Sequence, residues 1–149
     1  MIVLCGSASG PATEAKLNRP NMGIMLSPST WRKPWRQCWP ADNDCYAKRD
    51  EPGWWEREGE SAWLRMLDKI AGATHPPLFA VVPDVPFHWD RTLERSAKYL
   101  PELRLRSITA AIALQDGAES DDWTAAAALD TPAVFVGGST RWKWLQMGP

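Results

Sequence analysis

Five short apolar runs, each ended by turn-forming residues, are the feature of this sequence that most restricts its fold. They are MIVLC at 1–5, GIMLSP at 23–28, LFAVVPDV at 78–85, ITAAIALQDG at 108–117 and AVFVGG at 133–138. Their apolar residues are consecutive rather than alternating with polar ones, which is typical of strands covered on both faces. The chain is therefore expected to contain a sheet whose strands are buried between other layers.

Helical patterns lie between the later runs. Residues 54–70 place their apolar side chains on one helical face, and residues 90–100 form a second amphipathic stretch that Pro101 is expected to end. A third helix is expected at 121–129, where the leading acidic residues favour a helix N-terminus. Strands that alternate with helices predict an α/β fold with a mainly parallel sheet, either open or part of a barrel.

The composition is that of an ordinary globular protein. Hydrophobic residues make up 44% and charged residues 23% of the 149 residues, so a single α/β domain spanning 1–149 is expected. The net charge of -1 argues against a generally basic surface. The charge is uneven, however, because residues 31–49 hold more Lys and Arg than Asp. Such a local basic patch can attract a phosphate backbone even when the whole chain is nearly neutral.

No cofactor, metal or membrane segment is expected. The three Cys residues form no CxxC pair and only two His residues are present, which argues against a zinc site. GxGxxG and Walker patterns are absent, so a dinucleotide enzyme or a P-loop NTPase is not expected. No apolar run approaches the length that spans a membrane, and the first residues lack the basic segment of a signal peptide. A cytoplasmic protein with reduced thiols is predicted.

The stretch STWRKPWRQCWPADNDCY, residues 29–46, combines tryptophans with cations and then turns acidic. Trp rings can stack on nucleobases, and Arg and Lys side chains can bind phosphates. The candidate nucleic-acid contacts are Trp31, Arg32, Lys33, Trp35, Arg36 and Trp39. The alternative is structural, because Trp residues also fill cores and interfaces. The stretch would then be a Trp-rich lid over the sheet.

Polar residues and glycines follow the predicted strands at the point where each strand ends. They are Asp84 after the third run, Gln115 and Asp116 after the fourth, Gly137 and Gly138 after the fifth, and Asp42 after the Trp-rich stretch. In parallel α/β proteins, ligands bind beyond the carboxyl ends of the strands. Carboxylates, an amide and bare backbone at one edge suit a planar, hydrogen-bonding ligand such as a nucleobase. Taken singly, Asp84 can instead cap a helix, and the glycine pair can form an ordinary turn.

The order of these motifs resembles a known family. The set LSPSTWRKP, WPADNDCY, FAVVPDV, ALQDG and AVFVGGSTRWK is similar to the short phage and bacterial relatives of tRNA-guanine transglycosylase. These relatives include proteins that insert deazaguanines into DNA and related base-excising glycosylases. The resemblance covers residues 22–144. It implies a partial or reduced (β/α) barrel that acts at the N-glycosidic bond of a nucleobase.

The resemblance also implies roles for single residues. Asp42 matches the aspartate that acts as an acid or base near the nucleobase, and Asp84 matches the one that binds the guanine edge. Gln115 matches the glutamine that contacts the base carbonyl, while Gly137 and Gly138 match glycines whose backbone lies against the base. The chain departs from the family in two respects. Asn-Asp-Cys-Tyr stands at 43–46 in place of Asn-Gly-Ala-Phe, and roughly five strands are expected where a full barrel needs about eight, as in a chain truncated at its C-terminus relative to the family. No residue matches the nucleophilic aspartate, and the Cys/His zinc site is missing.

Three functions remain open at this stage. The first is base exchange or base excision on DNA or RNA, with the target base flipped into the pocket and Asp42 and Asp84 as catalytic residues. The second is a catalytically silent module that binds nucleic acid or a protein, which the missing nucleophile favours. The third is a hydrolase of small nucleotides or nucleosides. An incomplete barrel would expose strand edges, so the chain is also expected to form a homo-oligomer.

Overall fold

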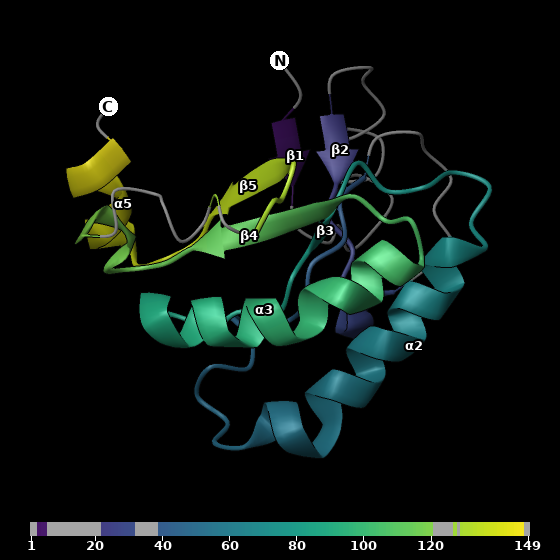
Figure 1. Ribbon diagram of the computed structural model, residues 1–149, viewed down its shortest axis with the longest axis horizontal. Coiled ribbons are helices and arrows are strands. Elements are labelled where there is room, and N and C mark those ends of the chain that lie inside the picture. The colour runs from purple at the N-terminus through teal and green to yellow at the C-terminus, as the bar shows by residue number, and fades with distance from the viewer. Residues whose placement is uncertain (1–2, 6–21, 32–38, 121–126, 128, 148–149) are drawn as a thin grey trace, which may run out of the picture.

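The computed structural model describes residues 3–5, 22–31, 39–120, 127 and 129–147 of the chain (Figure 1). The strands in this part are β1 (Val3–Cys5), β2 (Met22–Ile24), β3 (Ala80–Val81), β4 (Ala110–Leu114) and β5 (Ala133–Val136). The helices are α2 (Glu60–Ala71), α3 (Trp89–Leu105) and α5 (Thr140–Met147). Short helical turns complete the described elements: η1 (Pro28–Thr30), the π-helical η2 (Trp55–Gly59) and η3 (Ala118–Ser120).

The strands pair in parallel and in chain order. β1 pairs with β2, and β3 pairs with β4, which in turn pairs with β5. Ala41 joins the two groups, because it forms parallel bridges to Leu26 just after β2 and to Ala80 in β3. Backbone hydrogen bonds of 2.7 Å from Asp42 to Leu26 and of 2.8 Å from Val81 to Ala41 support these bridges. The predicted α/β fold with parallel strand pairing is therefore confirmed.

Two amphipathic helices pack on this sheet, and α2 and α3 lie on the same side of the strands (Figure 1). Helix α2 buries Trp63, Met66, Leu67 and Ile70, which recur at helical spacing along one face. All five residues of β4 are buried, as expected for a continuous apolar run. None of the helices in the described ranges has both the length and the apolar character needed to cross a bilayer.

The prediction that Pro101 ends its helix is wrong. Helix α3 continues through Pro101 to Leu105. Proline in a helix interior loses one backbone hydrogen bond and costs about 3 kcal/mol. Here Leu100 and Leu103, on either side of the proline, are almost fully buried in the core and keep the helix packed on the sheet. The helix predicted at 121–129 lies largely outside the described residues.

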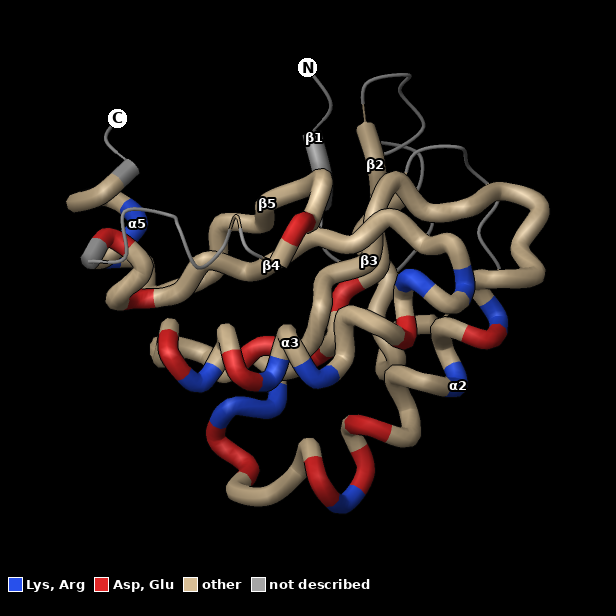
Figure 2. Tube along the Cα trace, viewed as in Figure 1, with Lys and Arg blue, Asp and Glu red and all other residues tan. Residues whose placement is uncertain are grey.

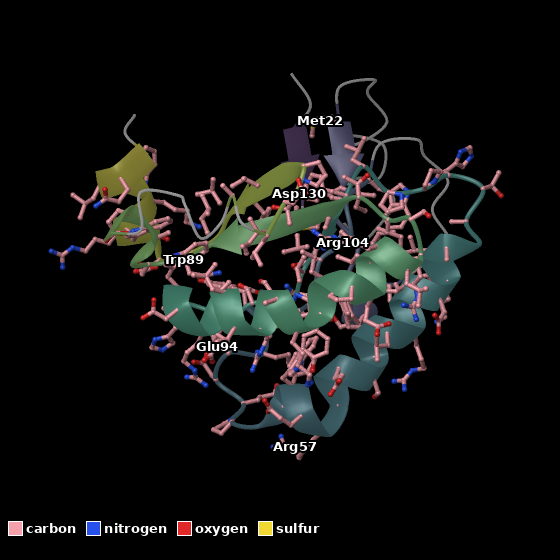
Figure 3. All side chains as sticks on the ribbon, in the orientation of Figure 1. Met22, Arg57, Trp89, Glu94, Arg104 and Asp130 are labelled. Atoms are coloured by element: carbon pink, nitrogen blue, oxygen red, sulfur yellow. The ribbon has the colours of Figure 1, made fainter. Side chains whose placement is uncertain are left out.

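Most tryptophans of the described ranges belong to the core. Those that are buried there are Trp39, Trp54, Trp55, Trp63, Trp89 and Trp142. The indole N–H of Trp55 donates to the Tyr99 hydroxyl at 3.2 Å, and the two ring centroids lie 5.4 Å apart. Trp89 lies where α3 begins beside α5 (Figure 3), and it packs in one cluster with Trp142. The high Trp content therefore reflects packing of helices against the sheet more than an exposed binding surface.

The outer edge of β5 and the neighbouring α5 carry exposed apolar side chains. Val134 is 55% exposed, Trp144 66% and Leu145 68%. Strand β5 pairs with β4, and none of the other described strands pairs with its second edge. An open edge beside apolar side chains is a template for association between chains.

Self-association is therefore expected, and Val134→Lys should weaken it by placing a charge on the edge strand. The mass of the wild-type chain and of this variant would be measured by light scattering over a range of concentrations. Leu105→Lys is the matched control, because Leu105 is 79% exposed but lies at the end of α3. A wild-type chain that remains monomeric throughout would contradict the prediction.

Candidate active site

The carboxyl ends of the strands bring most of the predicted polar residues to one edge of the sheet. Gln115 follows β4 directly and Gly137 follows β5 directly, while Asp84 comes three residues after β3. Asp42 follows Ala41, which pairs with β3 in the same parallel sense. Because all of these strands run in the same direction, their ends meet at one rim. This arrangement follows the prediction made from the ends of the apolar runs.

A buried hydrogen-bond network holds the centre of this rim. Asn43 donates from Nδ2 to Oδ1 of Asp84 at 2.9 Å and to the Val82 carbonyl at 3.0 Å. Gln115 donates from Nε2 to the second carboxylate oxygen of Asp84. The exposed fractions of Asn43, Asp84 and Gln115 are only 1%, 5% and 2%. Both oxygens of Asp84 are thus occupied by amide donors within the protein.

Sequence reasoning assigned no role to Asn43, although it lies next to the candidate Asp42. Its side-chain oxygen accepts the backbone N–H of Cys45 at 2.8 Å, so both the nitrogen and the oxygen of the Asn43 amide have hydrogen-bond partners within the protein. This bond fixes the turn that leads away from the rim. The signal available in the sequence was a polar amide two residues after Ala41, which bridges to β3, and this resembles the position of Gln115 directly after β4.

The carbonyl of the Gln115 side chain ties together the segments that follow three strands. It accepts the backbone N–H groups of Phe87 and Gly138, each at 2.9 Å. A Cβ atom at Gly137 would lie 2.5 Å from Nε2 of Gln115, so only glycine fits there. Gly138 has φ of +73°, a conformation that disfavours side chains. The glycine pair therefore has a structural reason that is independent of any ligand.

Asp116 binds the start of the C-terminal helix. Its Oδ1 accepts the backbone N–H of Ser139 at 2.6 Å, and its Oδ2 accepts the Ser139 hydroxyl at 2.7 Å. The Ser139 hydroxyl in turn accepts the N–H of Trp142 at 3.2 Å. Both carboxylate oxygens of Asp116 are engaged in this way, so it joins the end of β4 to α5. It still lines a cavity at the rim, together with Arg91.

Asp42 differs from the other carboxylates at the rim. One of its oxygens accepts the backbone N–H of Asn43 at 2.8 Å. The other has no hydrogen-bond partner among the described residues. Burial raises the pKa of Asp42 from 3.8 to about 6, and the nearby charges of Asp84 and Asp44 add to this rise. Asp42 is therefore a carboxyl group that exchanges a proton near neutral pH.

The pKa of Asp84 is also raised by burial, and the hydrogen bond from Asn43 opposes this rise. Burial raises the pKa of the Cys45 thiol as well, with a further contribution from the charge of Asp84. A buried thiol held in its neutral form is a poor nucleophile. Within the ranges that the structure describes, His, Cys, Asp and Glu side chains form no group of three that could hold a metal ion.

The Trp-rich stretch is only partly described. Arg32, Lys33, Trp35 and Arg36 lie outside the described residues. Trp31 is partly buried and meets Trp39 edge-on, with ring centroids 5.8 Å apart. Trp39 is fully buried and donates from Nε1 to the His75 carbonyl at 2.9 Å.

Trp39 therefore has no free face for a nucleobase, which corrects the prediction that its ring stacks on nucleic acid. Its backbone carbonyl accepts the N–H of Leu78, two residues before β3 begins. Asp42, three residues later, lies toward the carboxyl end of the strands. Trp39 thus enters the sheet from the amino end, away from the carboxylates that it was expected to accompany.

A groove of about 520 Å³ opens beside the network. Its walls come from residues 45–56 on one side and residues 85–95 on the other. Cys45 and Val85 line the end of the groove that is nearest to the network along the chain. Asp42 and Asp84 are not part of the lining. No sequence pattern predicted this groove, because it depends on how two distant segments pack.

Comparison of the chain with protein-family models, with curated proteins and with solved structures found no match in any of the three. The observations that bear on a function are therefore the geometry of the rim and the resemblance of the motifs.

The first prediction for this site concerns Asp42. A pKa that is raised on folding means that the ionised form is disfavoured, so the free energy of unfolding falls as the pH rises from about 4 to about 6. Asp42→Asn should remove this penalty and stabilise the protein at pH 8 by up to about 3 kcal/mol, with little gain at pH 4. Urea unfolding at both values checks this.

Asp50→Asn is the matched control, since the Asp50 side chain is 84% exposed. An equal effect of the two substitutions at pH 8, or a gain at pH 4 as large as that at pH 8, would contradict the prediction.

The second prediction concerns Gln115. Gln115→Met keeps the approximate volume but leaves the N–H groups of Phe87 and Gly138 without their acceptor. Unpartnered buried groups are costly, so a loss of about 2–4 kcal/mol is expected in urea unfolding. Gln146→Met, at an exposed position of α5, should change little. A loss at position 115 no larger than that at 146 would show that the amide does not hold the rim together.

Proposed function

We propose that this chain acts at the N-glycosidic bond of a flipped (modified) nucleobase in DNA or RNA, by base excision or base exchange. The observation that carries the proposal is the pair of rim carboxylates with contrasting environments. Asp84 has both oxygens occupied by amides, whereas Asp42 keeps one oxygen without a partner among the described residues. Two carboxyl groups held in different environments are a common arrangement for acid–base chemistry.

Asp42 is the group assigned to proton transfer. A pKa of about 6 leaves most of the side chain ionised at neutral pH, where it can accept a proton. In base excision, Asp42 would take a proton from water as the water oxygen bonds to the sugar carbon. The bond from that carbon to the base nitrogen breaks, and its electron pair leaves with the base, which is protonated by solvent. Water fits as the nucleophile because no residue of the sequence matches the family's nucleophilic aspartate.

Asp84 and Gln115 take a supporting role in this proposal. Their hydrogen-bonding groups are used on one another and on neighbouring backbone, so they position the rim rather than offer free edges to a base. The charge of Asp84 also helps to raise the pKa of Asp42. A base that enters the rim could bind Asp84 directly only by displacing an amide donor of Asn43 or Gln115.

The arrangement of the strands supports a partial (β/α) barrel as the finer description of the fold. The order of pairing from β1 to β5 follows the chain, with Ala41 between β2 and β3. Successive neighbouring parallel strands, with α2 and α3 on the same side, are what a barrel wall requires (Figure 1). We therefore infer that this chain forms part of such a wall.

The proposed reaction is tested by mass spectrometry of bases released from modified and unmodified DNA and tRNA, with and without added guanine or a deazaguanine. Release without incorporation is expected for excision, and incorporation for exchange. Asp42→Ala should abolish either activity, while Asp68→Ala, at an exposed position of α2 that lines none of the cavities, should leave it unchanged. The initial rate should also fall about tenfold between pH 7 and pH 5, because Asp42 becomes protonated. A rate that is unaffected by Asp42→Ala would exclude the assigned role.

A second candidate is a binding module without turnover. The observation that favours it is the internal use of the polar groups of Asp84 and Gln115, which leaves few free groups to recognise a base. Retained binding of nucleic acid with no base released from any substrate would support this module over the enzyme.

A further inference from the structure

We propose that the groove between residues 45–56 and 85–95 is where a nucleic-acid strand runs toward the rim, with Arg91 contacting a phosphate and Phe87 contacting an unstacked base. This inference rests on the proposed function, because it names the surface through which the same site would hold its polymer. Its two contact residues are not among those that the sequence predicted for nucleic-acid binding at 31–39.

The proposal is supported first by the position of Arg91 and by its lack of a partner among the described residues. Arg91 is exposed on α3 and lines three cavities that share residues, of about 520, 280 and 310 Å³. Together these cavities extend from Tyr99 to Asp116 at the rim. Within the described part of the chain, Arg91 has neither an ion pair nor a hydrogen bond from its side chain. Its guanidinium is thus available to a phosphate, which it can bind with two parallel hydrogen bonds.

The other cations of the groove already have partners. Lys48 lies 2.8 Å from Glu51, and Arg49 donates to the Tyr46 carbonyl at 2.9 Å. Arg95 contacts Glu56 at 3.3 Å and also donates to the backbone carbonyl of Asp84 at 3.0 Å. Figure 2 shows the charged loop that carries Lys48 and Arg49 close to the first half of α3. Arg95 thereby links the groove to the rim network, and Arg91 is left for a ligand.

The proposal is supported second by the backbone conformation of Phe87 and by the position of its ring. The φ of +68° at Phe87 lies in the left-handed region, which is strained for an aromatic residue. The hydrogen bond from its N–H to Gln115 holds the backbone in this conformation. The ring lines the groove and meets Tyr46 edge-on, with centroids 5.9 Å apart. Strain held in place by a buried network, in a residue that lines a cavity, is typical of functional sites.

An aromatic ring beside a free guanidinium favours nucleic acid over an acidic peptide. Bases stack on aromatic rings while the backbone phosphates bind cations, and single strands expose both groups. A peptide rich in Asp and Glu would use the cation but would leave Phe87 without a matching group.

The test measures binding of the full chain to a fluorescein-labelled single-stranded oligonucleotide by anisotropy at several salt concentrations. Arg91→Ala is compared with Arg65→Ala, which removes an exposed arginine from α2 that likewise has no partner in the described part of the chain. Loss of one phosphate contact should weaken binding several-fold and reduce the slope of log K against log salt by about 0.7. Arg65→Ala should leave both affinity and slope unchanged.

Phe87→Gly removes the ring but suits the positive φ, so the fold should be retained. Binding should weaken at every salt concentration while the salt slope stays the same, because stacking releases no counterions. Thermal unfolding of this variant serves as the check on folding. Equal binding by the Arg91 and Arg65 variants, or unchanged binding by a folded Phe87→Gly chain, would overturn the proposal. Competition by polyglutamate as strong as that by unlabelled oligonucleotide would also overturn it.

Base release by the wild-type chain, measured in parallel, separates this inference from the proposed function. If the wild-type chain releases bases but Arg91→Ala binds as well as Arg65→Ala, the groove does not hold the nucleic-acid strand, and the proposed enzymatic function stands. If Arg91→Ala weakens binding and wild type releases no base, the groove stands and the enzymatic function fails.

Discussion

The buried amide of Gln115 is the interaction on which the candidate site depends. One side chain binds Asp84, Phe87 and Gly138, and so it joins the segments that follow β3, β4 and β5. A buried amide must satisfy its donors and its acceptor, and this requirement leaves the neighbouring backbone little freedom. The absence of a side chain at Gly137 and the left-handed backbone of Phe87 both follow from the position of this amide.

The same network separates the roles of the two central carboxylates. Asp84 is surrounded by donors, and both of its oxygens accept hydrogen bonds from amide side chains within the rim. Asp42 has a single backbone donor and lies close enough to Asp84 for its pKa to be raised by that charge as well as by burial. The charge of Asp42 destabilises the fold at neutral pH, and the same raised pKa would suit this side chain to the proton transfer that we propose for it.

In the groove beside the rim, as in the network, most polar groups already have partners within the protein. Most cations of the groove are paired with nearby carboxylates or carbonyls, so the number of Lys and Arg residues in a sequence segment overstates what a ligand can meet. The same is true of the tryptophans, since burial of Trp39 and Trp63 in the core removes them from any surface. Residue type indicates what a side chain is able to bind, while its partners decide whether it is free to do so.

The sequence by itself determined the alternation of strands and helices and the residues at the carboxyl ends of the strands. These features depend on local periodicity and on the shared direction of parallel strands. Tertiary structure alone decided that Ala41 bridges β2 and β3, that α3 continues through Pro101, that Asn43 joins the network and that Trp39 lies in the core. Each of these depends on contacts between segments far apart in the chain, whose burial outweighs local preference and leaves no periodic signal to read.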